Sequence, residues 1–231
     1  MAIFTAGGIV GQVSGRVAGN VFSHNKGGPY IRNGTIPTTS TTPDAMAAKG
    51  RLTAASQAWQ ALTADQKLGW KTFAQNNPTV NRLGHTIHLT GHQWFVRCAT
   101  RLLQIPIAMP TTAPADTGPV GLTTLTLSAD LGAGTFDYTY TATPLAATEQ
   151  ARCFAFVADS AGVNFVKNQL RFIGVSAAAQ ASPFDCEAQL IAKFGTPTVG
   201  HYVHIAVDVI DNVSGLVSSP MVDSAIVEDT V

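Results

Sequence analysis

The sequence predicts an α+β protein: an N-terminal β-hairpin arm and a small helical unit, followed by an antiparallel β-sandwich. Three observations predict this class. The glycine-rich start alternates with the period of a strand, the tryptophan-bearing segments repeat with the period of a helix, and short strand-like runs follow at regular spacing. The expected parts are an arm and tether at residues 1–42, a helical domain at 43–104, a linker at 105–119 and the sandwich at 120–231.

The arm is expected to be a two-stranded hairpin. Its first strand, residues 12–21, would place Val13, Val17 and Val21 on one face, separated by glycines, and Arg16 on the other. Glycine weakens a strand but lets another backbone approach closely. Turn residues at 23–29 would return the chain as a second strand at 30–32. Because a lone hairpin is marginal in water, we expect it to lie on its own helices or on another subunit.

Three helices are expected after a proline- and threonine-rich tether at residues 33–43. Pro43 suits the first helical position with Thr42 as cap, Thr63 and Gln66 have capping-box spacing, and a similar pattern begins at Thr90. All three tryptophans of the chain fall in this region. The expected helical core consists of Trp59, Trp70, Phe73 and Trp94.

Beyond the prolines of residues 105–119 the pattern changes to short apolar runs separated by turn residues. The expected strands are residues 122–128, 135–143, 152–158, 163–167, 170–175, 184–194, 201–210 and 221–227. Seven or eight such runs favour a sandwich of about 100 residues.

The charge of the chain is low and unevenly distributed. Only 12% of residues are charged and the net charge is zero, so little electrostatic repulsion opposes association. Residues 1–104 carry ten Lys and Arg against two acids, which gives +8; the remainder carries four against twelve, which gives −8. We therefore expect the basic half to face something acidic, either nucleic acid or the acidic half of a neighbouring copy.

Residues that could carry chemistry are few. His85, His88 and His92 are close in sequence, but the glycines among them argue against a shared helix face, and no carboxylate lies nearby. The three cysteines have no metal-binding or disulfide spacing. No nucleophile elbow or phosphate-binding loop occurs. We expect no catalytic, cofactor-binding or metal-binding residues, and therefore no enzyme and no cofactor.

Membrane association is not expected either. No run of about 18 apolar residues occurs, and the start of the chain lacks the charge pattern of a secretory signal.

Three segments of the N-terminal half resemble a known group of proteins. They are SHNKGGPYIRNGTIP, ASQAWQALTADQKLGWKTFA and RLGHTIHLTGHQWFVR. With the glycine-rich start, they resemble a structural protein family encoded in tailed-bacteriophage and prophage genomes, over roughly residues 10–104 and more loosely beyond. The resemblance implies a virion component and supplies no catalytic residues. Separately, HYVHIAVDVIDNVSGLVSSP resembles the last hairpin of fibronectin type III and immunoglobulin-like domains, which bears on fold class only.

Composition and resemblance together predict a non-enzymatic virion structural protein: capsid-associated, a cement or decoration protein, or a head–tail component. Its expected partners are other copies of itself and other virion proteins, bound by strand addition from the arm. The residues expected to make these contacts are Val13, Arg16, Val17, Val21, Tyr30 and Arg32. Two alternatives remain open, a nucleic-acid-binding protein that uses the basic half and an adhesion module that binds glycan or protein.

Overall fold

The computed structural model describes residues 2–5, 7–8, 12–34, 39–81, 83–115, 118–160, 162–163 and 165–230. It contains helices and antiparallel sheets, which confirms the α+β class. The chain divides into two compact units. One comprises Met1–Leu103 with Met109–Ala113, and the other Gln104–Ala108 with Pro114–Val231, so the segment expected to be a linker is shared between them.

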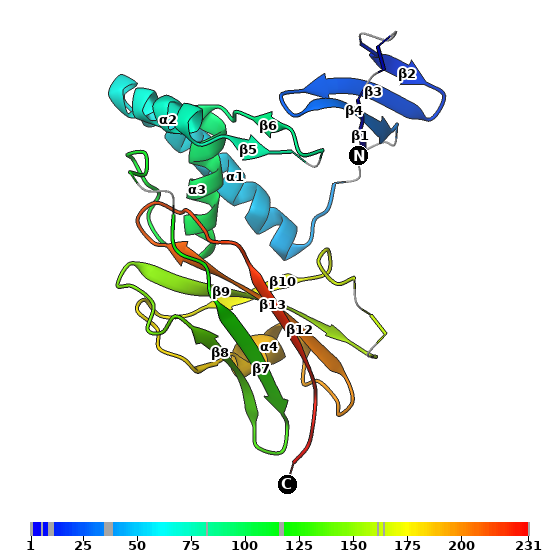
Figure 1. Cartoon of the computed structure of the whole chain (residues 1–231), viewed down its shortest axis with the longest axis vertical. Coiled ribbons are helices and arrows are strands. Elements are labelled where there is room, and N and C mark those ends of the chain that lie inside the picture. The colour runs from blue at the N-terminus through cyan, green and yellow to red at the C-terminus, as the bar shows by residue number, and fades with distance from the viewer. Residues whose placement is uncertain are drawn as a thin grey trace. The chain divides into compact units, whose positions relative to one another are not determined.

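The N-terminal sheet has four antiparallel strands, ordered β1-β4-β3-β2 (Figure 1). They are β1 (Ala2–Ile3), β2 (Gly15–Val17), β3 (Asn20–Asn25) and β4 (Gly28–Asn33). The predicted two-stranded hairpin is therefore wrong. The chain turns at Ala18–Gly19 and again at Lys26–Gly27, and Ala18 has a φ of 51°, in the left-handed region that side chains other than glycine seldom adopt.

The turn at Ala18 changes which side chains share a face. Val17 pairs with Asn20, so Val21 lies on the opposite face from Val17. Val21 lies between Arg16 and Arg32 in a row across three strands. The predicted face of valines does not form, because the turn at Ala18–Gly19 lies between Val17 and Val21 and puts them on opposite faces of the sheet.

Three helices follow the sheet, with a two-stranded hairpin between the second and third. They are α1 (Pro43–Ala61), α2 (Ala64–Asn76), β5 (Thr79–Val80), β6 (Thr86–Ile87) and α3 (Gly91–Gln104). The Thr63 hydroxyl accepts from the Gln66 backbone N–H, and the Gln66 side chain accepts from the Thr63 N–H, forming the predicted capping box. Thr90 and Gln93 make the same pair of bonds before α3. Thr42 makes no such side-chain bond.

The helical core is built from rings on α2 and α3. Trp70 is fully buried, and its ring centroid lies 5.4 Å from that of Phe95, edge to face. Phe73 and Trp94 are also buried, with ring centroids 5.3 Å apart. A side chain at Gly91 would come within 2.9 Å of the Trp70 backbone, so glycine permits this close approach of the two helices. Trp59 is only partly buried.

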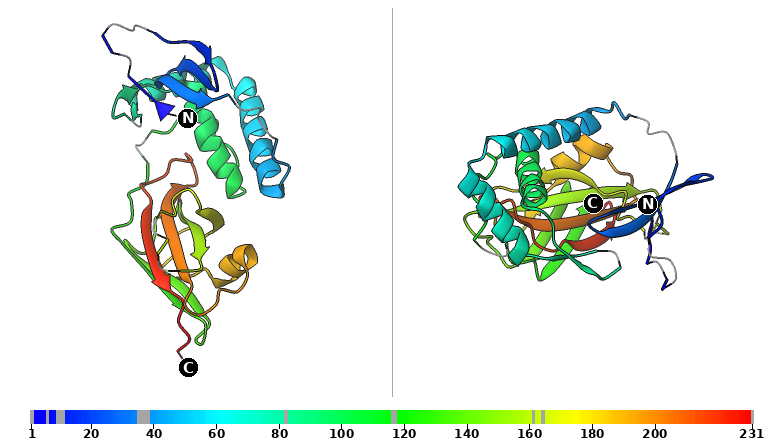
Figure 2. Two further views of the ribbon diagram at one scale, coloured as in Figure 1. Left: turned by 90° about the vertical axis from the view of Figure 1, so that its right-hand side faces the viewer. Right: turned by 90° about the horizontal axis from the view of Figure 1, so that it is seen from above.

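The second unit contains two sheets, ordered β10-β9-β12-β13 and β11-β8-β7. Their strands are β7 (Thr124–Asp130), β8 (Thr135–Thr141), β9 (Glu149–Ala158), β10 (Arg171–Val175), β11 (Phe184–Asp185), β12 (Tyr202–Asp211) and β13 (Met221–Ile226). The one helix described in this unit, α4 (Glu187–Phe194), lies beside the sheets (Figure 2).

One core lies between these sheets. Alternate residues of β8, such as Phe136 and Tyr138, and of β12, such as Ile205 and Val207, are almost fully buried in it. Leu190 of α4 joins the same core. Along one side the sheets are linked, because the Asp223 carboxylate of β13 accepts from the Leu127 backbone N–H of β7 at 2.7 Å.

Two predicted strands are wrong. Residues 163–167 form no strand among those described, and residues 184–194 form the short β11 and the helix α4. The apolar side chains Leu190, Ile191 and Phe194 repeat at helical spacing, but eight residues are too few for that period to stand out in the sequence.

Candidate functional site

The N-terminal sheet is poorly covered along its described length. Among the described side chains from Ile3 to Gly34, each is intermediate or exposed, and none is buried. Glycines at 15, 19, 27 and 28 supply almost no apolar area of their own. This sheet, which we call the arm sheet, therefore lacks the second layer that normally buries one face of a sheet.

The two faces of the arm sheet differ in chemistry. Register places Phe22 beside Ile31, and the ring of Phe4 lies edge to face with Phe22 at 6.2 Å between centroids. These three side chains form an apolar face. The opposite face carries Arg16 and Arg32, with no acidic side chain anywhere among residues 1–43.

The predicted arm residues are only partly brought together. Arg16, Val21 and Arg32 form the row described above, and register places Tyr30 on the same face as that row. Val17, which is 62% exposed, lies on the apolar face. Val13 precedes β2 and belongs to no strand.

Strand β2 is one edge of the arm sheet. The two-residue turn makes Val17 and Asn20 a hydrogen-bonded pair, so the next pair, Arg16 with Val21, directs its backbone groups away from one another. The N–H and C=O of Arg16 therefore point outward along the edge. Its guanidinium folds back, donating from Nε to the Ala18 carbonyl at 3.2 Å and lying against Gly34.

A hydrogen bond connects the arm sheet to the β5–β6 hairpin. Asn81 donates from its amide to the Gly27 carbonyl at 3.0 Å, while its Oδ1 accepts from the backbone N–H groups of Leu83 and His85. Asn81 thus holds its own hairpin turn and the Lys26–Gly27 turn of the arm sheet at once.

The predicted helical-core residues occupy different environments. Trp70, Phe73 and Trp94 are buried together, as described above. Trp59 instead packs its ring against His92 at 5.4 Å and Phe95 at 5.5 Å, measured between centroids.

The described residues offer two observations on metal-binding and thiol groups. Among the described residues, no group of three or more His, Cys, Asp and Glu side chains could hold a metal ion. Burial raises the pKa of Cys98 to about 11, so its thiol stays protonated and weakly nucleophilic at neutral pH. A hydrogen bond with Cys186, together with burial, raises the pKa of Cys153 well above its ordinary value.

Sequence reasoning missed one buried ion pair. Arg152 of β9 and Asp208 of β12 lie opposite one another and are 5% and 7% exposed. The guanidinium donates twice, to Oδ1 at 2.8 Å and to Oδ2 at 2.7 Å. A charged residue in each of two apolar strands was the available signal, but the strand register that pairs them is not readable from sequence.

Among the described residues, no helix is both long and apolar enough to cross a membrane. Comparisons of the chain with protein-family models, curated proteins and solved structures return no match.

Proposed function

We propose that this chain is a non-enzymatic structural subunit of a tailed-bacteriophage virion, which joins its neighbours through the arm sheet. The observation that carries the proposal is the exposed arm sheet itself. This single-layer sheet has Phe4, Phe22 and Ile31 on one face and no buried side chain among those described from Ile3 to Gly34. Covering that face with a neighbouring subunit would remove apolar area from water, at roughly 25 cal/mol for each Å².

Two features support association of like chains. The basic face of the arm sheet lies in a half with a net charge of +8, and the second half carries −8, so copies are electrostatically complementary. The outward backbone groups of Arg16 can pair with an edge strand of a neighbour, the mode known as strand addition. The resemblance to phage structural proteins supplies the virion context.

We further propose that residues 120–230 are a β-sandwich related to fibronectin type III and immunoglobulin-like domains. Two antiparallel sheets that share one core support this assignment. A helix in place of a strand at α4, and the β7–β13 link along one side, are departures from a simple sandwich.

The first test compares two substitutions of Arg16, one that removes its backbone N–H and one that changes only its side chain. Arg16→Pro removes the outward N–H while leaving the bonds between Val17 and Asn20, because edge strands tolerate proline where the N–H faces solvent. Arg16→Ala keeps the N–H and removes only the charge. We expect Arg16→Pro to reduce self-association in sedimentation velocity far more than Arg16→Ala.

A second pair of variants tests the apolar face. Phe22→Ser should also weaken association, whereas Val213→Ser, which alters a 67% exposed side chain in the other unit, should not. Both variants should remain folded by circular dichroism. A wild-type chain that stays monomeric at all concentrations and is absent from purified particles would refute the proposal. Equal behaviour of the two Arg16 variants would refute strand addition while leaving docking by the apolar face intact.

Nucleic-acid binding is the alternative that the same experiments can reveal. If the arginine row binds phosphates, affinity for single- or double-stranded DNA should fall steeply with salt concentration, and Arg16→Ala should weaken it as much as Arg16→Pro.

A further inference from the structure

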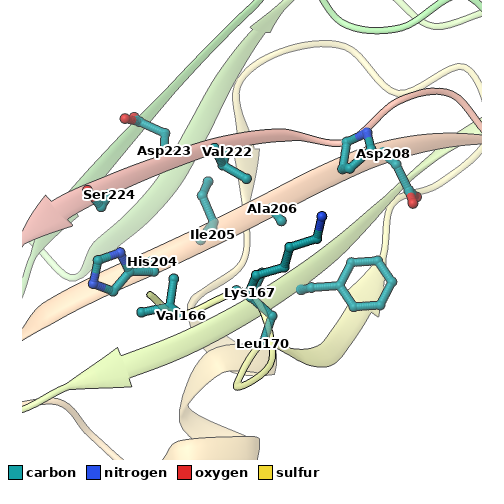
Figure 3. Close-up of a pocket in the computed structure, with 12 residues that line it drawn as sticks. Val166, Lys167, Leu170, His204, Ile205, Ala206, Asp208, Val222, Asp223 and Ser224 are labelled. Atoms are coloured by element: carbon teal, nitrogen blue, oxygen red, sulfur yellow. The ribbon is translucent and has the colours of Figure 1, made fainter. Parts of the chain in front are cut away.

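A pocket of about 830 Å³ lies on the outer face of the β10-β9-β12-β13 sheet (Figure 3). Its floor is a row across three strands: Phe154 of β9, Ala206 of β12 and Val222 of β13 are paired neighbours by register. Val166 and Leu170, from the loop before β10, line it as well. Ala206 is the smallest side chain of the floor, and the pocket lies over it between larger apolar groups.

The volume and composition suit a small ligand with an apolar body. Binding pockets for small molecules typically have volumes of about 300–1,000 Å³ and are lined mainly by apolar side chains. Aliphatic groups such as those of Val166, Leu170 and Val222 cannot hydrogen-bond the hydroxyls of a sugar. Val222 is 69% exposed, which leaves apolar area at its end of the floor for a ligand to cover.

One cationic side chain of the pocket lining has no partner among the described residues. Lys167 has no hydrogen bond or ion pair with any of them, and Figure 3 shows its amino group beside Ala206. The carboxylate of Asp208 is already paired with Arg152, and that of Asp223 accepts from the Leu127 N–H. The Asp208 charge is therefore neutralised, and register pairs Asp223 with Ile205, whose side chain lies in the core, so the Asp223 carboxylate is on the opposite face of the sheet from Ala206 and Val222. The unpaired charge on the pocket face is that of Lys167.

A second polar group lines the pocket without a partner. Nε2 of His204 is buried and makes no hydrogen bond to the described residues. Burial lowers the pKa of His204, so its ring is neutral at neutral pH and can donate or accept one hydrogen bond. The Ser224 side chain, paired with His204 across β12 and β13, adds a hydroxyl.

From this arrangement we infer that the pocket binds a small amphipathic carboxylate, with its apolar body over Ala206 and Val222 and its carboxylate at Lys167. The exposed Ser224 hydroxyl is available to hydrogen-bond a polar group of the same ligand. The site lies wholly in the second unit and does not depend on the arm sheet or on assembly.

The experiment compares three probes with the same ten-carbon chain and different ends: decanoate, 1-decanol and decyltrimethylammonium. Binding to the full-length chain is measured by calorimetry below the concentrations at which each probe aggregates, and the site is mapped by amide chemical-shift changes. We expect decanoate to bind most tightly, with shifts concentrated in β12, β13 and residues 165–170.

Three variants then test the roles of the Lys167 charge and of the pocket floor in binding. Lys167→Met keeps the length of the side chain and removes its charge, so decanoate should bind about fivefold more weakly while decanol is unaffected. Val222→Asp adds a negative charge at an exposed position and should weaken decanoate binding at least as much without affecting folding. Ala206→Leu should occlude the floor and abolish binding of all three probes.

The matched control is Lys193→Met, which removes a lysine from a separate groove between β10 and α4 and should leave decanoate affinity unchanged. Three outcomes would each overturn the inference: no binding of any probe, equal affinity for all three probes, or an effect of Lys193→Met equal to that of Lys167→Met. Shift changes confined to residues outside the pocket would overturn it as well.

Discussion

Each of the two units contains a four-stranded antiparallel sheet, and the two sheets differ in what covers them. Every described side chain of the arm sheet remains at least partly exposed. In the β10-β9-β12-β13 sheet, by contrast, Val203, Ile205 and Val207 of β12 are at most 1% exposed. Both sheets have regular ladders. Strand β12 pairs with β9 along ten residues, and strand β3 pairs with β4 along six residues.

The difference shows that a hydrogen-bonded ladder does not create a core by itself. The net contribution of a backbone hydrogen bond is modest, because the unfolded chain bonds to water instead. The second unit adds a facing sheet and α4, so the alternate side chains of β12 lose their contact with water. The arm sheet, which is rich in glycine, has the ladder without such a layer. Among the described residues, its stability therefore rests on the ladder and on few contacts such as those of Phe4 with Phe22 and of Asn81 with Gly27.

The largest effect is expected where the second unit buries charge. Asp208→Ala would leave the Arg152 guanidinium, 5% exposed, without its partner and should reduce the free energy of unfolding by about 3–5 kcal/mol. Urea unfolding measures the change. The double variant Arg152→Met/Asp208→Leu should lose much less, since both charges are then gone. A loss below about 1 kcal/mol in the single variant would show that water reaches the pair.

In the helical unit, two tryptophan variants test whether the loss of stability also follows the burial of the side chain. Trp70→Ala empties a fully buried site beside Phe73 and Phe95 and should cost about 3–5 kcal/mol. Trp59→Ala should cost clearly less, because that ring is partly exposed. Denaturant unfolding followed by far-ultraviolet circular dichroism compares the two. Equal losses would mean that Trp59 contributes through its contacts with His92 and Phe95 rather than through burial.

A matched pair of valine variants compares the two sheets directly. Val207→Ala in β12 removes buried methyl groups and should cost about 2 kcal/mol. Val21→Ala in the arm sheet should change the stability of the isolated chain by less than about 0.5 kcal/mol. If Val21→Ala costs as much as Val207→Ala, the arm sheet is covered within its own subunit.

The effect expected at a turn is stabilising and is smaller than that of Val207→Ala. Ala18→Gly relieves a φ of 51° and should stabilise the β2–β3 turn by about 1 kcal/mol, seen as slower hydrogen exchange at Asn20. The control is Ala179→Gly, the other described residue besides glycine with positive φ, at 55°. If ladders in the second unit unfold together, Ala179→Gly should slow exchange throughout that unit, whereas Ala18→Gly acts only locally. Faster exchange at Asn20 in Ala18→Gly would show that chain entropy outweighs the relieved strain.

Features set by residues close together in the sequence could be predicted, and features set by pairing between distant residues could not. The capping box at Thr63 involves residues three apart, and the alternation within β8 and β12 lies within single strands, so all were predicted. The turn at Ala18 was missed because its residues continue the spacing of the valines. Helix α4 was missed because only eight residues carry its period.

The candidate surfaces depend on strand pairing between distant residues. Arg152 and Asp208 are 56 residues apart, and only the register of β9 against β12 brings them together. The same is true of Phe154 and Ala206 in the pocket floor. Two-residue side-chain periodicity predicts which face a residue occupies but not its neighbour on the next strand.

The shortness of β2 bears on solubility. A long, flat, unpaired edge can recruit strands from any chain and lead to aggregates, and natural proteins commonly avoid this with short edge strands. Strand β2 has three residues, and within it the outward backbone groups belong to Arg16, a charged residue. Such an edge can accept a matched partner strand while offering too few free groups to support indiscriminate stacking of chains. A protein with few surface charges and no net charge can therefore carry an open sheet edge at little risk of precipitation.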